Sequence, residues 1–156
     1  GNPFGEITAL LTKYFAQTDV KAALHVGDHE WVSGDGTAHP NPVAIHLAND
    51  VMQPLLHKIP PLLEHLRILF YVGQWDGSCC NFAGTHDMLR NMSWPHQAEF
   101  NNAARQRWSV GGLTAGYAKA AANLTSLLIL ESGHLVPMDQ PEAALDMLSR
   151  FLAGTD

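Results

Sequence analysis

Apolar residues recur along the chain at two spacings, which predict a mixture of helices and strands. Two short apolar runs, residues 67–72 and 127–130, fit buried strands, because neither is long enough for a helix of its own. Each run ends in a turn signal that contains Gly. Elsewhere the spacing is helical. It predicts helices at residues 5–17, 20–25, 81–91, 97–106 and 141–152, with Thr18-Asp19 as the cap of the second.

Three stretches are less regular. Residues 43–65 are apolar at helical spacing but contain Pro54, Pro60 and Pro61, so either two helices or one kinked helix fits. Residues 107–110 and 113–120 predict a hairpin around Gly111-Gly112, although the Ala-rich residues 118–122 also fit a helix. Residues 27–42 are rich in Gly, Asp, Ser and Pro, which is typical of a surface loop.

The number of strands has a consequence for the size of the domain. A strand that is apolar throughout, as residues 127–130 are, should be covered on both faces and paired on both edges. Two convincing buried strands and a hairpin are too few to do this. The final helix, with Ala144, Leu145, Leu148, Phe151 and Leu152 on one side, should lie on the sheet. We therefore expect a fragment of a larger α/β domain.

Polar side chains follow the two predicted strands. Asp76 comes just after the first strand, and His134 follows the turn that ends the second. Asp139, as the candidate cap, and Pro141, in the first turn, then signal the start of a helix. Open α/β sheets place their chemistry at the carboxyl ends of strands. Asp before His is also the order of these two triad members in α/β-hydrolases, so we expect the side chains of Asp76 and His134 to meet.

A nucleophile for such a triad is missing from the chain. No Ser has Gly both two residues before and two residues after it, the pattern of a strand-to-helix elbow. Ser78 and Ser132 lie near the proposed pair but not on an elbow. If the triad interpretation holds, the Ser lies on polypeptide before residue 1. His134 would take its proton, and Asp76 would orient the His134 ring.

Composition excludes several other classes of protein. The 156 residues are 46% hydrophobic and 15% charged, which is typical of a globular chain. The net charge of −6 argues against a nucleic-acid partner, and no apolar run approaches the ~18 residues that span a bilayer. Protonation of all nine His would change the net charge from −6 to +3. Such a change of sign points to an acidic compartment.

Two cysteines, two sequon asparagines and a group of possible metal ligands were also considered as sites. Cys79 and Cys80 are adjacent and cannot form an ordinary disulfide with each other, so each is a buried thiol or a partner for another chain. Asn91 and Asn123 begin glycosylation sequons. His25, Asp28, His29 and Glu30 lack the spacing of a known ligand set, so no metal site is expected there.

The motifs around Asp76 and His134 resemble those of the serine carboxypeptidase family. Gly73-Gln-Trp-Asp76 resembles the first family motif and Ser132-Gly-His-Leu-Val-Pro-Met-Asp-Gln-Pro141 the second. The likeness is greatest to the C-terminal part of vitellogenic-like and cathepsin A-like members. Further matches run along nearly the whole chain, at Asp19–His25, Trp94–Gln97 and Ala115–Tyr117.

This resemblance implies an α/β-hydrolase fold in which the chain supplies the last strands of the sheet and their flanking helices. Residues 1–156 would be the light chain of one catalytic domain, completed by an N-terminal heavy chain that carries the Ser. The implied activity is the release of C-terminal residues from peptides at acid pH. Asp76 and His134 would be catalytic, and Cys79 and Leu135 would line the substrate pocket.

The resemblance also implies a setting for the protein. Together with the two sequons and the His content, it makes glycosylation at Asn91 and Asn123, zymogen processing and a lysosomal, vacuolar or secreted location expected. The partners would be the heavy chain and a peptide substrate, with a homodimer left open. No cofactor, metal, nucleic acid or membrane is expected.

Departures from the family pattern leave alternatives open. Gln74 stands where an acidic residue is usual, and a Cys that many members carry between residues 27 and 42 is missing. The acidic pair that grips the substrate carboxylate and the oxyanion hole would lie outside this chain. Relatives of the fold include acyltransferases and hydroxynitrile lyases with the same Asp and His. A non-catalytic binding subunit that keeps the fold is a third reading.

Overall fold

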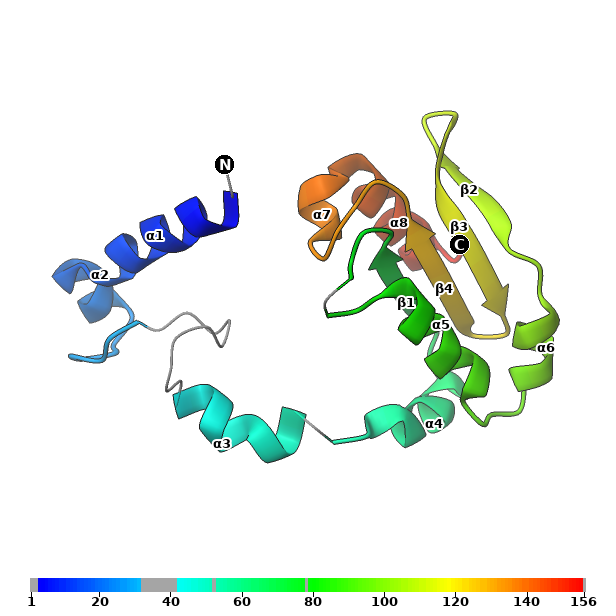
Figure 1. The fold of residues 1–156 in the computed structure, drawn as a ribbon, viewed down its shortest axis with the longest axis horizontal. Coiled ribbons are helices and arrows are strands. Elements are labelled where there is room, and N and C mark those ends of the chain that lie inside the picture. The colour runs from blue at the N-terminus through cyan, green and yellow to red at the C-terminus, as the bar shows by residue number, and fades with distance from the viewer. Residues whose placement is uncertain (1–2, 32–41, 52, 78, 156) are drawn as a thin grey trace. The chain divides into compact units, whose positions relative to one another are not determined.

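The structure is a computed structural model that describes residues 3–31, 42–51, 53–77 and 79–155. It divides into two compact units, Gly1–Pro54 and Leu55–Asp156, and each is described by itself. The first unit is helical, and the second contains a four-stranded sheet with helices on it (Figure 1).

The first unit contains α1 (Pro3–Phe15), α2 (Thr18–Ala23) and α3 (Pro42–Val51). The predicted helices at residues 5–17 and 20–25 are confirmed to within a few residues. The expected cap at Thr18-Asp19 is wrong, because Thr18 already lies in α2 and Gln17 precedes the helix without a side-chain cap. Most of the predicted surface loop, residues 32–41, lies outside the described residues.

The segment with three prolines forms separate helices, as one of the two alternatives predicted. After α3 the chain passes Pro54 and forms a 3-10 helix, η1 (Leu55–Lys58), followed by α4 (Ile59–Leu63). Pro60 and Pro61 lie in the first turn of α4. Backbone N–H groups in a first turn have no partner within the helix, so proline is tolerated there.

Four strands form one mixed sheet: β1 (Ile68–Gly73), β2 (Gln106–Val110), β3 (Leu113–Ala121) and β4 (Leu124–Ile129). Their order is β1-β4-β3-β2, with β1 parallel to β4 and the other neighbours antiparallel (Figure 1). The predicted hairpin is confirmed. The helical alternative for residues 118–122 is wrong, because β3 pairs with β4 as far as Ala121. Pairing on both edges outweighs the helix propensity of Ala.

The position of β4 corrects one expectation. β4 lies inside the sheet between β1 and β3. Both edges of the most apolar strand are therefore paired within this chain. β1 is the outer strand on the side of the sheet away from the hairpin, and its second edge is unpaired among the described strands. A parallel strand with an open edge is unusual, because parallel sheets are normally covered and paired.

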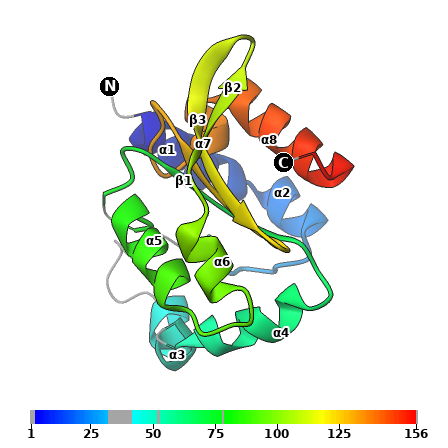
Figure 2. The same cartoon turned by 90° about the vertical axis from the view of Figure 1, so that its right-hand side faces the viewer.

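Helices cover both faces of the sheet (Figure 2). On one face, α5 (Phe82–Asn91) and α6 (Gln97–Asn102) enclose a cluster around the fully buried Leu89 and Phe100. On the other, α8 (Pro141–Ala153) packs on Leu127 and Ile129. Side chains alternate between faces along β4, so each residue contributes to one cluster. Burial of each large side chain stabilises the fold by about 1.5–3 kcal/mol.

The α8 helix is where the predicted apolar face was partly wrong. Ala143, Ala144 and Met147 are buried against the sheet, whereas Leu145, Leu148 and Leu152 are 67%, 50% and 72% exposed. Apolar residues occur around most of the helix, so their spacing alone could not select the inner face. Small side chains face the sheet and allow α8 to approach it closely.

Two other features differ from the prediction. α6 ends at Asn102, and three residues separate it from the start of β2 at Gln106, whereas the spacing had extended the helix to residue 106. A short helix, α7 (Val136–Asp139), precedes α8 and was not predicted. No helix in the described part of the chain combines the length and apolar character needed to cross a bilayer.

Candidate active site

Two loops that follow the parallel strands form the site. β1 and β4 are in register from Ile68 opposite Leu124 to Gly73 opposite Ile129, so both strands end at the same edge of the sheet. Asp76 comes three residues after β1, and His134 comes five residues after β4. The sheet register therefore brings together two side chains that are 58 residues apart in the sequence.

Backbone hydrogen bonds join these loops to each other. The Gln74 N–H donates to the Ile129 carbonyl at 2.9 Å, and the Trp75 N–H donates to the Ser132 carbonyl at 2.8 Å. Gly73 allows the close approach, because a Cβ atom there would lie 2.1 Å from the Gly133 oxygen. Backbone contacts alone thus hold the two loops against each other.

The side chains of Asp76 and His134 are in direct contact, as the sequence analysis expected. His134 Nδ1 lies 2.8 Å from Asp76 Oδ2. The Asp76 side chain is only 4% exposed, whereas that of His134 is 54% exposed. The buried carboxylate can therefore orient the ring while the rest of the ring stays open to other molecules. The catalytic roles of both residues stay predictions at this point.

Hydrogen bonds determine the ionisation of Asp76. The bond from the His134 ring lowers the pKa of the Asp76 carboxyl below 3.8, while removal of water from around the carboxyl opposes this effect. The backbone N–H groups of Cys79 and Cys80 lower the pKa further, and the Cys79 group donates to Oδ1 at 3.3 Å. The carboxylate therefore stays ionised in mildly acidic solution.

A second carboxylate supports the loop that carries His134. Asp139 Oδ2 accepts a hydrogen bond from the Gly133 N–H at 2.7 Å. The predicted role of Asp139 as the helix cap is wrong, because Gln140 precedes α8 and no side chain caps that helix. Asp139 instead lies in α7 and holds the backbone beside the His134 imidazole.

The Ser132 side chain is buried in the loop after β4 and is hydrogen-bonded to the backbone. It is fully buried, and its hydroxyl donates to the Ile129 carbonyl at 3.1 Å. This bond turns the chain at the end of β4 and directs the hydroxyl away from solvent. The geometry agrees with the expectation that Ser132 is not the nucleophile. Ser78 lies outside the described residues.

The two cysteines are exposed, and they form no disulfide in the part of the chain that the structure describes. The prediction of a buried thiol is therefore wrong for Cys79 and Cys80, because the turn after Asp76 runs along the surface. Leu135 directly follows His134 and is 37% exposed. Cys79 thus follows Asp76 by three residues and Leu135 follows His134 by one, and their role in binding substrate stays a prediction.

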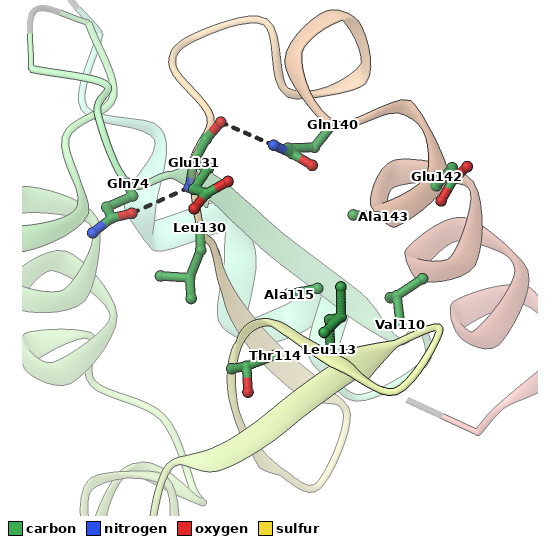
Figure 3. A pocket seen from close by; sticks show the side chains of 10 residues that line it. All are labelled: Gln74, Val110, Leu113, Thr114, Ala115, Leu130, Glu131, Gln140, Glu142 and Ala143. Carbon is green, nitrogen blue, oxygen red and sulfur yellow. Dashed lines mark hydrogen bonds between the residues drawn. The ribbon is translucent and has the colours of Figure 1, made fainter.

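A cleft of about 480 Å³ lies beside the two loops (Figure 3). Glu131 stands at its rim with a left-handed backbone (φ 54°), which is strained for a residue other than Gly. Gln74 Oε1 accepts from the Glu131 N–H, and Gln140 Nε2 donates to the Glu131 carbonyl, each at 3.1 Å (Figure 3). Sequence reasoning missed this clamp, although it had noted that Gln74 replaces a usual acidic residue.

The two sequon asparagines lie outside the active-site loops. Asn123 precedes β4, at the opposite end of that strand from His134, and its Nδ2 donates to the Leu63 carbonyl at 2.8 Å. Asn91 ends α5 and is exposed. Glycosylation at both positions stays a prediction.

One group of side chains has the composition of a metal site. The ligand atoms of Asp76, Cys80 and His134 all lie within 4.8 Å of one another. The stretch from His25 to Glu30, considered from the sequence, supplies no group of this kind among the described residues. No spacing in the sequence pointed to a combination of Cys80 with Asp76 and His134.

Comparisons with known proteins agree with the geometry. The family model described as serine carboxypeptidase matches residues 5–154. The chain is 35% identical to a venom serine carboxypeptidase of Apis mellifera over 141 residues, which is 90% of this chain and 29% of the relative. It is 36% identical to a vitellogenic carboxypeptidase of Aedes aegypti over 143 residues, which is 92% of this chain and 30% of the relative.

A solved structure shows the same fold. The crystal structure of Kex1(delta)p, a prohormone-processing carboxypeptidase from Saccharomyces cerevisiae, matches with a TM-score of 0.72 at 23% identity. The match covers 94% of this chain and 32% of that chain. The present chain thus spans about a third or less of the proteins it matches, and its fold is the corresponding part of an α/β-hydrolase. A family model that matches nearly every residue, and relatives above 30% identity over nine-tenths of the sequence, establish that this chain belongs to the serine carboxypeptidase family.

Proposed function

We propose that this chain supplies the Asp and His of a Ser-His-Asp triad that removes C-terminal residues from peptides at acid pH. The observation that carries the proposal is the 2.8 Å contact between His134 Nδ1 and Asp76 Oδ2 at the carboxyl ends of adjacent parallel strands. Family membership and the order of Asp before His support it.

The proposed chemistry follows from the two environments. With Nδ1–H bonded to the Asp76 carboxylate, the second ring nitrogen of His134 is an acceptor, which a general base requires. It would take the proton of the Ser hydroxyl as the oxygen attacks the last peptide bond, and return that proton to the leaving amino group. The buried Asp76 carboxylate would stabilise the imidazolium that forms between these steps. Water would then repeat the sequence and release the shortened peptide.

The nucleophile in this proposal lies on a heavy chain, of which this chain is the light partner within one catalytic domain. Two surfaces support an association of this kind. β1 has an open edge among the described strands, and the exposed Leu145, Leu148 and Leu152 form an apolar stripe on α8. Apolar stripes and strand edges are normally covered. A homodimer of the assembled enzyme would be a further level of organisation.

The proposed setting is the lysosome, the vacuole or the outside of the cell. Nine His residues and a net charge of −6 favour work in an acidic compartment, where protonation lowers the negative charge. Asn91 and Asn123 are the proposed glycosylation sites, and zymogen processing would produce the light chain. Treatment with a glycosidase should shift the mass of the light chain if either site is occupied.

Peptide hydrolysis tests the proposal directly. The assembled enzyme should release the free C-terminal amino acid from an N-blocked dipeptide at a pH of about 5, and a fluorophosphonate should label the heavy chain. His134→Ala should abolish both reactions in an enzyme that still assembles. Assembly of the variant is measured by size-exclusion chromatography.

Other outcomes would favour other functions. Fluorophosphonate labelling without peptide hydrolysis would contradict the carboxypeptidase assignment and favour an acyltransferase. Cleavage of a cyanohydrin would favour a hydroxynitrile lyase. Absence of labelling in the assembled wild-type protein would contradict every serine-dependent function and favour a binding subunit.

A further inference from the structure

The cluster formed by Asp76, Cys80 and His134 combines three different kinds of ligand atom. A carboxylate oxygen, a thiol sulfur and an imidazole nitrogen all lie within 4.8 Å of one another. Asp76 is buried and held by hydrogen bonds, whereas Cys80 and His134 are exposed. Asp76 and His134 are therefore held to each other, and the exposed Cys80 side chain can adjust from the solvent side.

This donor set selects a particular class of metal ion. Mg²⁺ and Ca²⁺ bind oxygen ligands, whereas Zn²⁺ and related borderline cations accept sulfur, nitrogen and oxygen together. Three protein ligands with a fourth position open to water are typical of accessible zinc sites. We propose that Asp76, Cys80 and His134 bind a borderline divalent cation such as Zn²⁺, and that the bound ion switches off the active site. The second part of this inference rests on the proposed function.

The spacing of the cluster is compatible with coordination after a small movement. Zinc bonds are about 2.3 Å long to sulfur and about 2.0–2.2 Å long to nitrogen or oxygen, so neighbouring ligand atoms lie about 3.5 Å apart. The three ligand atoms lie within 4.8 Å of one another, and Cys80, which is on the surface, can move to reach this spacing. On binding, the Cys80 thiol loses its proton to solvent and becomes the thiolate ligand.

Metal binding and base catalysis at His134 exclude each other. If the ion binds Nε2, that nitrogen can no longer accept a proton. If the ion binds Nδ1, the hydrogen bond to Asp76 Oδ2 is lost and the remaining ring proton resides on Nε2. In both cases the imidazole cannot act as a general base. The ion therefore inhibits through the same two side chains that the proposed triad uses.

The adjacent cysteines provide a matched pair of variants. Cys80 belongs to the cluster, whereas Cys79 does not. Assembled enzyme, reduced with a non-chelating phosphine, is titrated with Co²⁺ or Cd²⁺ while the near-ultraviolet thiolate-to-metal absorption is recorded. We expect a saturable band with one ion per light chain, displaced by Zn²⁺ and unaffected by Mg²⁺. Cys80→Ser should weaken binding by at least about tenfold, and Cys79→Ser should retain it.

Peptidase assays then connect binding with inhibition. For each protein, activity with Zn²⁺ is divided by its own metal-free activity, so differences in basal rate cancel. Wild-type and Cys79→Ser enzymes should lose activity over the concentration range in which the band saturates, and Cys80→Ser should require at least about tenfold more Zn²⁺. Cys80→Ala serves as a second variant if the Ser side chain disturbs folding, as judged by circular dichroism.

The possible results separate this inference from the proposed function. Absence of a thiolate band in the wild-type protein, or loss of the band in Cys79→Ser but not in Cys80→Ser, overturns the metal site. Equal Zn²⁺ inhibition of wild-type and Cys80→Ser enzymes overturns the switch. A Cys80-dependent band in a protein without peptidase activity would support the site and contradict the proposed function. An active enzyme without the band would contradict the metal site alone.

Discussion

Gly73 and Gly133 lie so close together at the ends of β1 and β4 that no side chain fits at Gly73. A Cβ atom placed there would be 2.1 Å from the Gly133 carbonyl oxygen and 2.5 Å from that of Ser132. Both contacts are with backbone, which cannot rotate away as a side chain can. The loops that carry Asp76 and His134 can therefore approach only because residue 73 is Gly.

Substitution of Gly73 by Ala should push the two loops apart. We expect the free energy of unfolding to fall by about 1–3 kcal/mol, as for other overpacked sites, and peptide hydrolysis to fall as the Asp76–His134 contact lengthens. Gly77→Ala is the matched control, since nothing lies within 4 Å of a Cβ there. Urea unfolding and steady-state assays of the assembled enzyme measure both effects. Equal behaviour of the two variants would show that the close approach does not restrict residue 73.

Asp76→Asn should preserve the shape of the site and remove the charge that orients the ring. The amide can donate a hydrogen bond to His134 Nδ1, which favours the tautomer that has its proton on Nε2. We expect kcat to decrease by roughly 10⁴-fold with little change in KM. A variant that retains more than about a tenth of the wild-type kcat would remove Asp76 from the triad.

The lowered pKa of Asp76 predicts how stability depends on pH. The hydrogen bond from His134 favours the carboxylate in the folded protein, so its pKa lies below the reference value of 3.8. Stabilisation is then complete above the unfolded pKa and is lost as pH falls through the lower, folded pKa. Unfolding free energies of the assembled enzyme between pH about 5 and about 2 should therefore fall less steeply for Asp76→Asn than for the wild type. Parallel curves would contradict this linkage.

Substitution of Asp139 tests whether its hydrogen bond to the Gly133 N–H supports the loop that carries His134. Asp139→Ala removes the acceptor for the Gly133 N–H and should lower the free energy of unfolding by about 1 kcal/mol. Because Gly133 precedes His134, kcat should also decrease. Asp139→Asn keeps an oxygen acceptor and should recover most of both losses. If Asn and Ala variants behave alike, the negative charge rather than the hydrogen bond is what matters.

Sequence patterns predicted the strands, the hairpin and the meeting of Asp76 with His134, because these features depend on local periodicity and on the parallel pairing rule. The central position of β4 was not predictable from strand count. The inner face of α8 was also missed, since its apolar residues extend around most of the helix. Contacts made by single side chains were the hardest features to predict from the sequence. The clamp of Gln74 and Gln140 on Glu131 depends on loops whose shape no spacing reports.

The 156-residue chain by itself should not be a stable protein. Its open β1 edge and the exposed leucines of α8 would be left in water without the proposed heavy chain. We expect the 156-residue chain to aggregate, or to melt without a cooperative transition, in differential scanning calorimetry. The assembled enzyme is the control. A sharp transition of the isolated chain would contradict the proposed division of the domain.

The hairpin between β2 and β3 offers a practical opening for protein engineering. Added Cβ atoms at Gly111 and Gly112 would meet nothing within 4 Å, and the turn belongs to the excursion between Asp76 and His134 rather than to the strands that align them. Since β1 and β4 pair directly, lengthening that turn leaves their register untouched. An affinity peptide or a fluorophore grafted there would give a tagged protein in which β1 and β4 still hold Asp76 beside His134.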